Sequence, residues 1–119
     1  MKVSEAMAYA DRLTGEPVES DVKLMWLNRL EKVLFNDIYS QYENPPKNAA
    51  LLTGADCDLS VEEPYSNIYP LYISLCCSLE RQETEVYANK ASAYMSAFSS
   101  FADYYNRTHM PKSANISVI

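Results

Sequence analysis

Glycine is scarce in this sequence, with 2 residues in 119 against 6 prolines. Such a chain has no glycine-rich phosphate loop and few of the tight turns that all-β folds need. Histidine occurs once, at His109, and cysteine three times, at Cys57, Cys76 and Cys77. One histidine without a spaced cysteine pair supplies neither a catalytic triad nor a familiar zinc site. We therefore expect a helical protein without metal or cofactor, and not an enzyme.

Positive charge is also in short supply. Ten basic side chains stand against 16 acidic ones, which gives a formal net charge of −6 and an isoelectric point near 4.7. The acidic excess lies in residues 1–63, which hold 12 acids and 6 bases, whereas residues 64–119 hold 4 of each. Nucleic-acid binding proteins gain affinity by neutralising phosphates with basic groups. An acidic chain is therefore not expected to bind DNA or RNA specifically.

Long hydrophobic runs are absent as well. No stretch approaches the length of a membrane span, and residues 1–5 lack the apolar core of a signal peptide. An odd number of cysteines, two of them adjacent, fits no disulfide framework. We expect synthesis in a reducing cytoplasm and no contact with a membrane. The length of 119 residues, with 48% apolar and 22% charged side chains, is typical of one globular domain.

Four segments have the apolar spacing of amphipathic helices, and together they predict an all-α, four-helix bundle-like fold. The expected helices cover residues 3–13, 20–43, 65–80 and 83–108. Pro45 and Pro46 end the second helix, and Pro70 marks either a late start of the third helix or a kink in it. The fourth helix has a heptad-like seam for an antiparallel partner, formed by Tyr87, Ala91, Tyr94, Phe98, Phe101 and Tyr105.

The apolar faces of three helices supply the predicted core. We expect these side chains to be largely buried: Trp26, Leu30, Leu34, Leu75, Tyr94, Phe98 and Phe101. Cys76 and Cys77 are expected to be buried as small hydrophobes, because neighbours on a helix point about 100° apart and form no unstrained disulfide. The polar side of the second helix, which includes Glu31 and Asp37, is assigned to solvent.

Residues 44–63 differ in character from the helices. Leu51–Leu52 and Leu59–Val61 are short β-capable pieces, and between them Thr53–Asp56 has the composition of a hairpin turn. The segment therefore predicts a small two-stranded hairpin or an ordered loop, with Cys57 as the most reactive of the three thiols. A lone hairpin is marginally stable in water, so we expect it to pack against the helices or another subunit.

The C-terminal residues 112–119 follow the helix-stopping Pro111 and contain an apolar pattern, Ile116, Val118 and Ile119. Such a short segment cannot bury these side chains by itself, so we expect a flexible tail beside a single helical domain of residues 1–111. An extended strand with apolar side chains is suited to pairing with a sheet edge or a groove of a neighbouring protein. The predicted hairpin at residues 47–61 would offer one such edge.

Tyrosine is abundant, with 10 Tyr against 3 Phe and 1 Trp. So many phenol rings do not all fit inside a core of this size, and tyrosine is favoured at protein interfaces. No nucleophile with a general base can be named from the residues. The residues alone therefore indicate an assembly or adaptor protein.

Four stretches follow one another along the chain: Val3-Ser4-Glu5-Ala6, then Trp26-Leu27-Asn28-Arg29-Leu30, then Glu63-Pro64-Tyr65 with Ile68-Tyr69, and finally Phe101 to Pro111. In this order they resemble a family of tailed-phage and prophage structural proteins from the head–tail region, the head–tail connector or head-completion adaptors. The resemblance spans most of the chain. Its most specific part is the ending Tyr105-Asn106-Arg107-Thr108-His109-Met110-Pro111.

The resemblance implies a virion protein at the head–tail junction, made in the cytoplasm of a bacterial host. Connectors of this kind are helical bundles that form a ring below the portal protein and extend the DNA channel towards the tail. The implied partners are further copies of the chain, the portal protein and tail-side adaptor or stopper proteins, while DNA passes through without specific binding. The candidate interface residues are Tyr104, Asn106, Arg107, His109, Ile116, Val118 and Ile119.

The residues leave a second class open. A small, acidic, helical chain with surplus tyrosine also fits a cytoplasmic module that dimerises and binds or regulates a partner. A stable compact dimer would favour the regulator, whereas a monomer or a large ring would favour the connector.

Overall fold

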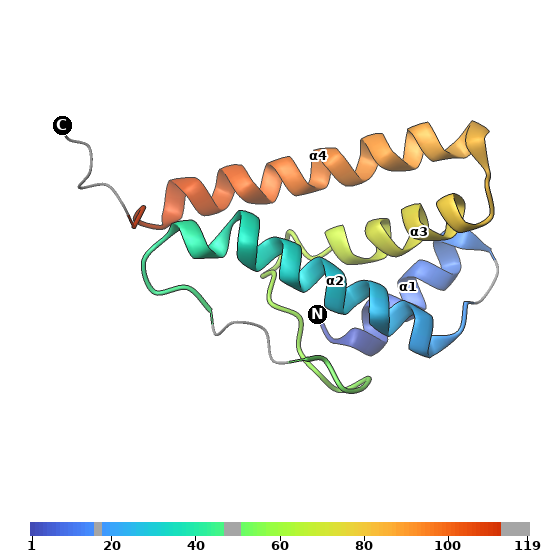
Figure 1. Cartoon of the computed structure of the whole chain (residues 1–119), viewed down its shortest axis with the longest axis horizontal. Coiled ribbons are helices and arrows are strands. Elements are labelled where there is room, and N and C mark those ends of the chain that lie inside the picture. Colours follow the sequence, from blue (N-terminus) through green and yellow to red (C-terminus); the bar gives the residue numbers. More distant parts are fainter. Residues whose placement is uncertain (16–17, 47–50, 113–119) are drawn as a thin grey trace.

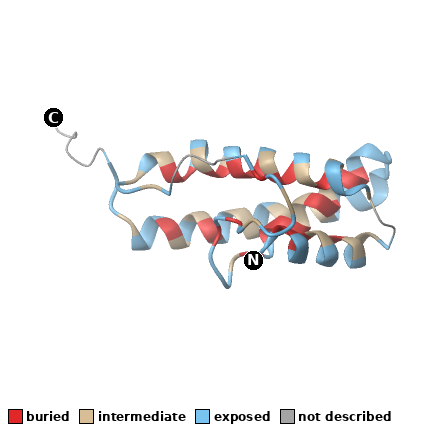
Figure 2. Ribbon diagram, turned by 90° about the horizontal axis from the view of Figure 1, so that it is seen from below, coloured by how far each residue is buried: buried red, intermediate tan, exposed pale blue. Residues whose placement is uncertain are grey.

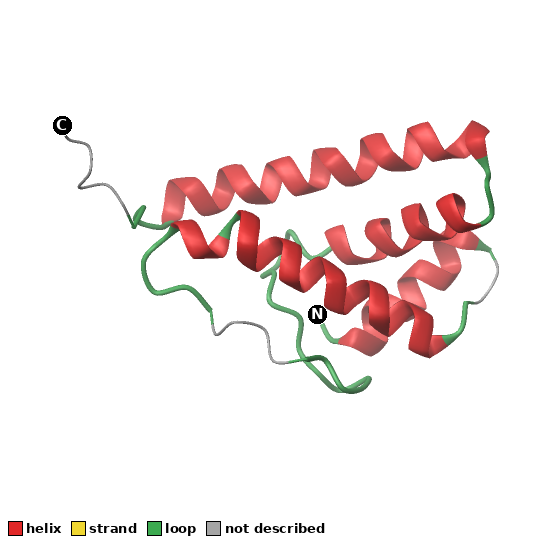
Figure 3. Cartoon of the chain, in the orientation of Figure 1, coloured by secondary structure: helices red, strands yellow, loops and turns green. Residues whose placement is uncertain are grey.

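A computed structural model describes residues 1–15, 18–46 and 51–112, and within these ranges the chain forms four α-helices and one 3₁₀ turn (Figure 1). The elements in chain order are α1 (Val3–Thr14), α2 (Ser20–Asp37), the 3₁₀ turn η1 (Tyr39–Gln41), α3 (Ile68–Glu80) and α4 (Thr84–Thr108). Figure 3 shows only helix and loop in the described part of the chain. The expected all-α class is confirmed.

Helix α3 lies at the centre of the packing, because it contacts α1, α2 and α4. Its sequence is apolar over most of its circumference, and 8 of its 13 residues are buried. Pro70 is the third residue of α3, in the first turn, where a helix leaves its backbone N–H groups without helical partners. The predicted late start of this helix is therefore confirmed.

Helix α2 ends earlier than its apolar stripe predicts. The expected helix runs to residue 43, but α2 ends at Asp37 and the chain turns through η1. The turn places the Tyr39 ring against α4, with ring centroids 6.1 Å from Phe101 and 5.1 Å from Tyr105. Burial of this aromatic side chain (2% exposed) stabilises the turn over continued helix.

The segment between η1 and α3 forms a loop over residues 51–61 instead of a hairpin. Its backbone pairs with the N-terminus: Val3 N–H donates to Cys57 O, and Leu59 N–H donates to Met1 O, each at 3.0 Å. The Asn28 amide fixes the backbone of Leu52, accepting from its N–H at 2.7 Å and donating to its carbonyl at 3.2 Å. The loop's backbone groups are thus used by other elements. Residues 47–50 of the predicted hairpin lie outside the described residues.

The predicted core is confirmed for four of its seven members. Trp26, Leu30, Leu34 and Phe101 are buried, as are Cys76 and Cys77 (Figure 2). The other three, Leu75, Tyr94 and Phe98, are only partly buried. Predicting them as largely buried was wrong, because a seam in the sequence indicates which side of a helix faces inward but not how completely its partner covers that side.

Two charged side chains of α2 are buried. Lys23 is 4% exposed, and its Nζ lies 2.8 Å and 2.9 Å from the two carboxylate oxygens of Asp11, which joins α2 to α1. Glu31 is 5% exposed, so its assignment to solvent was wrong. A buried carboxylate needs several hydrogen bonds in place of water, and Glu31 has them.

Candidate functional site

The C-terminal end of α4 is packed with aromatic rings contributed by several segments. We use the name aromatic cluster for these residues: Tyr39, Tyr42, Tyr65, Phe101, Tyr104, Tyr105 and His109. Tyr105 is central, with ring centroids 5.1 Å from Tyr39, 5.2 Å from Tyr42 and 5.8 Å from Phe101. Tilted and edge-to-face contacts of this kind stabilise beyond their buried area. The cluster joins α4 to η1 and to the loop before α3.

His109 caps α4 from inside the aromatic cluster. Its ring stacks on Tyr105 with centroids 3.6 Å apart and planes within 3°. Its backbone N–H donates to Tyr105 O at 3.0 Å, and Nδ1 lies 3.2 Å from the same carbonyl and 2.8 Å from Thr108 Oγ1. The His109 backbone N–H thus closes the last turn of α4, and the imidazole lies against the same carbonyl. The arrangement fixes the point at which the chain leaves the helix.

The residues after α4 pair with the residues after η1. Glu43 N–H donates to Met110 O at 2.8 Å, and Lys112 N–H donates to Gln41 O at 2.9 Å. Tyr42 and Pro111 form the antiparallel bridge between these bonds. We call this pairing of residues 41–43 with 110–112 the clamp. It fixes the position of Lys112, the last residue of the described ranges.

A side-chain bond reinforces the clamp. The Tyr42 hydroxyl donates to Asn106 Oδ1 at 2.9 Å, and the Tyr42 ring lies 6.5 Å from that of His109. Asn106 lies in the last turn of α4 and His109 directly follows the helix, and both reach Tyr42. Two of the candidate interface residues therefore act within the chain, where they hold the C-terminal exit in place.

The remaining candidate residues have different environments. Tyr104 is half-buried and stacks on Tyr65 with centroids 4.7 Å apart, while Arg107 is exposed. Partial desolvation and the nearby Glu62 carboxylate raise the pKa of Tyr104. The three predicted tail residues, Ile116, Val118 and Ile119, lie outside the described residues.

A buried hydrogen-bond network around Glu31 connects α2, the 51–61 loop and α3. Ser60 donates to the carboxylate from its N–H and from its hydroxyl, each at 2.9 Å, and the Tyr69 hydroxyl donates at 2.7 Å. Val61 N–H donates to the Tyr69 oxygen at 2.9 Å, and the Tyr39 hydroxyl lies 2.8 Å from Ser60 Oγ. Both carboxylate oxygens are therefore satisfied within the chain.

This network anchors the 51–61 loop to α2 and α3. Burial raises the pKa of Tyr39 and of Tyr69 well above the ordinary value of a phenol, and the Glu31 carboxylate is the second-largest cause at Tyr69. Both phenols therefore stay protonated. The Glu31 carboxylate accepts from the Tyr69 phenol and the Ser60 backbone, the Tyr69 oxygen accepts from the Val61 backbone, and the Tyr39 phenol bonds the Ser60 hydroxyl. The network could not be predicted from the sequence, because a buried acid on an amphipathic helix looks the same as a solvated one until its partners are known.

The three thiols differ in reactivity. Burial raises the pKa of Cys76 to about 11 and also raises the pKa of Cys77. Hydrogen bonds from Thr53 lower the pKa of Cys57, whose Sγ lies 3.7 Å from Thr53 Oγ1. The loop thiol therefore has the largest thiolate fraction, although no basic residue is needed to produce it.

Two further observations concern metal-binding groups and membrane-spanning helices. Among residues 1–15, 18–46 and 51–112, no three His, Cys, Asp or Glu side chains come together in a group that could hold a metal ion. No helix in the same part of the chain is both long and apolar enough to cross a membrane. Comparison with protein-family models, with curated proteins and with solved structures finds no match to this chain.

Proposed function

We propose that this protein is a non-enzymatic structural subunit of a tailed-phage virion, a head–tail connector. In this proposal its copies assemble as a ring below the portal protein, at the head–tail junction, and extend the DNA channel towards tail-side adaptor and stopper proteins. The protein would be made in the bacterial cytoplasm and incorporated during virion assembly.

The clamp is the observation that best supports this proposal. The ending that carries the most specific part of the family resemblance, Tyr105 to Pro111, is the part of the chain that builds the clamp and the helix end beside it. Pro111 forms the bridge of the clamp, Asn106 bonds Tyr42 beside it, and His109 stacks on Tyr105 at the helix end. A small domain that anchors the base of a C-terminal segment in this way is suited to presenting that segment to a neighbour in an assembly.

Charge is consistent with a DNA channel that does not retain its cargo. The net charge of −6 opposes binding of a polyanion, and the acidic excess of residues 1–63 falls on α1, α2 and the loop that follows. Like charges repel, so an acidic wall lets DNA slide without the counterion release that drives binding. The less buried part of the α4 seam, with Tyr87 and Tyr94, provides tyrosine-bearing surface for protein contacts.

The test is deletion of the gene from the phage or prophage that carries it, followed by complementation. Without the protein we expect filled or leaking heads that lack tails, seen by electron microscopy, and the wild-type chain should restore infectious particles. Truncation after Lys112 should leave the free energy of unfolding within about 1 kcal/mol, because few core contacts are lost. The same truncation should nevertheless fail to restore tailed particles.

A matched pair of tail variants refines this test. Replacing the apolar residues Ile116, Val118 and Ile119 with serine should fail to complement, whereas replacing Ser113, Asn115 and Ser117 with alanine should succeed. Normally tailed particles in the absence of the gene would contradict the connector proposal. A stable compact dimer in light scattering, together with normal virions, would instead support the regulatory module.

A further inference from the structure

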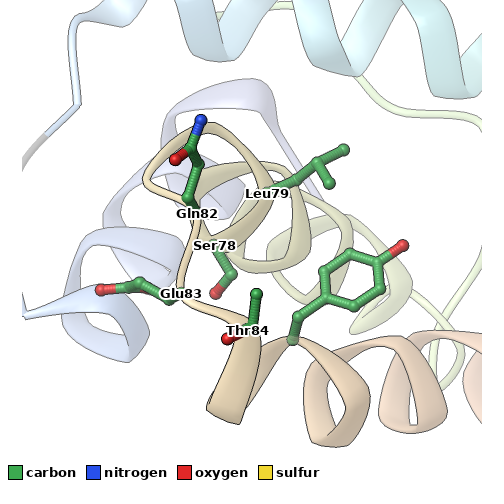
Figure 4. Close-up of a pocket in the computed structure, with 6 residues that line it drawn as sticks. Ser78, Leu79, Gln82, Glu83 and Thr84 are labelled. Atoms are coloured by element: carbon green, nitrogen blue, oxygen red, sulfur yellow. The ribbon is translucent and has the colours of Figure 1, made fainter.

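A hollow lies at the corner where α3 turns into α4, at the opposite end of α4 from the clamp (Figure 4). We call it the corner hollow. It has a volume of about 350 Å³ and is lined by Ser78, Leu79, Gln82, Glu83, Thr84 and Tyr87. This size is at the lower end of the range for binding pockets, about 300–1,000 Å³, and suits one or two amino-acid side chains. The corner hollow combines exposed apolar surface with a hidden polar group.

The apolar part of the corner hollow is uncovered. Leu79 is 62% exposed and Tyr87 is 37% exposed, although Tyr87 begins the seam predicted to face a helix partner. Ser78 at the inner wall is fully buried, and its hydroxyl has no hydrogen-bond partner among the described residues. Buried hydroxyls are normally paired. A ligand for this site should therefore bring apolar side chains together with backbone-like polar groups.

The C-terminal segment has this chemistry. In an extended conformation Ile116 and Val118 point to the same side, and the backbone presents N–H and C=O groups along its edges. Residues 79–87 carry Glu80, Glu83 and Glu85 against one base, Arg81, and residues 113–119 contain no acidic side chain that these carboxylates would repel.

The segment cannot reach the corner hollow of its own molecule. The clamp fixes Lys112 beside Gln41 at the C-terminal end of α4, and the hollow lies at the N-terminal end of the same helix. The 25 residues of α4 separate these ends by about 36 Å. From Lys112, residues as far as Ile119 reach at most about 25 Å even when fully extended. If the C-terminal segment binds in a corner hollow, that hollow must therefore belong to a second copy of the chain.

We propose that residues 113–119 of one copy bind in the corner hollow of a second copy, with Ile116 and Val118 against Leu79 and Tyr87. The contact is head-to-tail, since it joins different surfaces of the two copies, and repetition closes a ring when the rotation between neighbours permits. This inference rests on the self-association in the proposed function and names the surfaces that carry it.

Photo-cross-linking of the full chain tests the inference. A photoreactive phenylalanine at position 119 leaves Ile116 and Val118 in place. We expect dimer-sized products whose cross-links map to residues 78–87. Leu79→Ser should lower the yield about tenfold, because the docked segment loses roughly half of a leucine's burial. Met95→Ser is the matched control, since Met95 is 61% exposed on α4 and does not line the hollow, and it should leave the yield unchanged.

Each other outcome overturns the inference. Cross-links within one molecule would contradict the reach argument. Cross-links to the groove between α2 and the loop, lined by Met25, Arg29, Lys32 and Leu51 among others, would assign the segment to a different surface. Absence of any cross-link, or equal yields from Leu79→Ser and Met95→Ser, would also refute it. The experiment uses the purified chain alone. A negative result would refute this contact but not the connector proposal, which the complementation test decides.

Discussion

Both halves of α4 carry aromatic side chains, but the halves have different surroundings. In the C-terminal half Phe101 and Tyr105 are 1% and 4% exposed, whereas in the N-terminal half Val86, Tyr87 and Met95 are 40%, 37% and 61% exposed. Among the described elements, the N-terminal half of α4 packs against α3, which is about half as long as α4 (Figure 1). The C-terminal half extends past the start of α3 and meets η1, the loop residue Tyr65 and the clamp.

This difference shows that burial depends on the number of segments that meet a helix as well as on its apolar spacing. One neighbouring helix covers one side of an aromatic seam. Three neighbours enclose it. The enclosed half is thus expected to determine stability, and the open half is available for contacts with other chains.

Truncation of the seam rings should show the largest effect. Phe101→Ala removes a fully buried ring and leaves a cavity, so we expect a loss of about 3–5 kcal/mol in the free energy of unfolding. Phe98→Ala removes a partly buried ring and should cost roughly 1–2 kcal/mol. Urea unfolding followed by circular dichroism measures both. Equal losses would mean that the two rings are equally enclosed.

Disruption of the Glu31 network, which lies in the buried interior beside Tyr39, should have the next largest effect on the free energy of unfolding. Glu31→Gln places an amide N–H₂ where two donors, Ser60 and Tyr69, now point, and should cost about 1–3 kcal/mol. Asp37→Asn, an exposed acid on the same helix, is the control and should change stability by less than about 0.5 kcal/mol. A similar result for both variants would show that the network does not anchor the loop.

Alkaline pH should destabilise the protein through Tyr39 and Tyr69, the two phenols of the Glu31 network. The pKa values of Tyr39 and Tyr69 are raised by burial above the ordinary 10.0, so these phenols stay protonated in the folded chain while the unfolded chain loses the protons. Their contribution to stability is complete below pH 10 and decreases as the pH rises above it. Urea unfolding across this pH range measures the decline. With Tyr39→Phe and Tyr69→Phe combined, the decline should be smaller.

The smallest effect is expected in the open half. Leu79→Ser and Met95→Ser replace exposed side chains, so each should change the free energy of unfolding by no more than about 0.5 kcal/mol. Thermal unfolding measures this. A loss comparable to that of Phe98→Ala would mean that the corner already contributes to the core of the isolated chain.

Helix positions and part of the core could be predicted from the sequence because they depend on local spacing and on proline. The starts of α1, α2 and α4 lie within one residue of expectation, and Trp26, Leu30 and Leu34 are buried as expected. The early end of α2 could not be predicted. It depends on Tyr39 reaching Phe101 and Tyr105, which are more than 60 residues away in the chain.

The candidate site could be predicted less completely. The sequence singled out Tyr104, Asn106 and His109, and they do lie close together at the end of α4, but their contacts with Tyr42 and Tyr65 follow only from the fold. Glu31 and Asn28 were missed because each acts through a loop that pairs with other elements instead of with itself. Non-local pairing of this kind leaves no periodic signal.

The clamp also has a mechanical consequence. A tension applied to the C-terminal segment arrives at Lys112 and meets the hydrogen bonds to Gln41 O and from Glu43 N–H before it reaches the end of α4. These bonds pass part of the force into η1 and α2, and the His109 ring stacked on Tyr105 passes the rest into the enclosed half of α4. A pull on the segment is therefore shared between two helices. A neighbouring molecule that pulls on the segment would load α2 as well as α4 before the end of α4 unwinds.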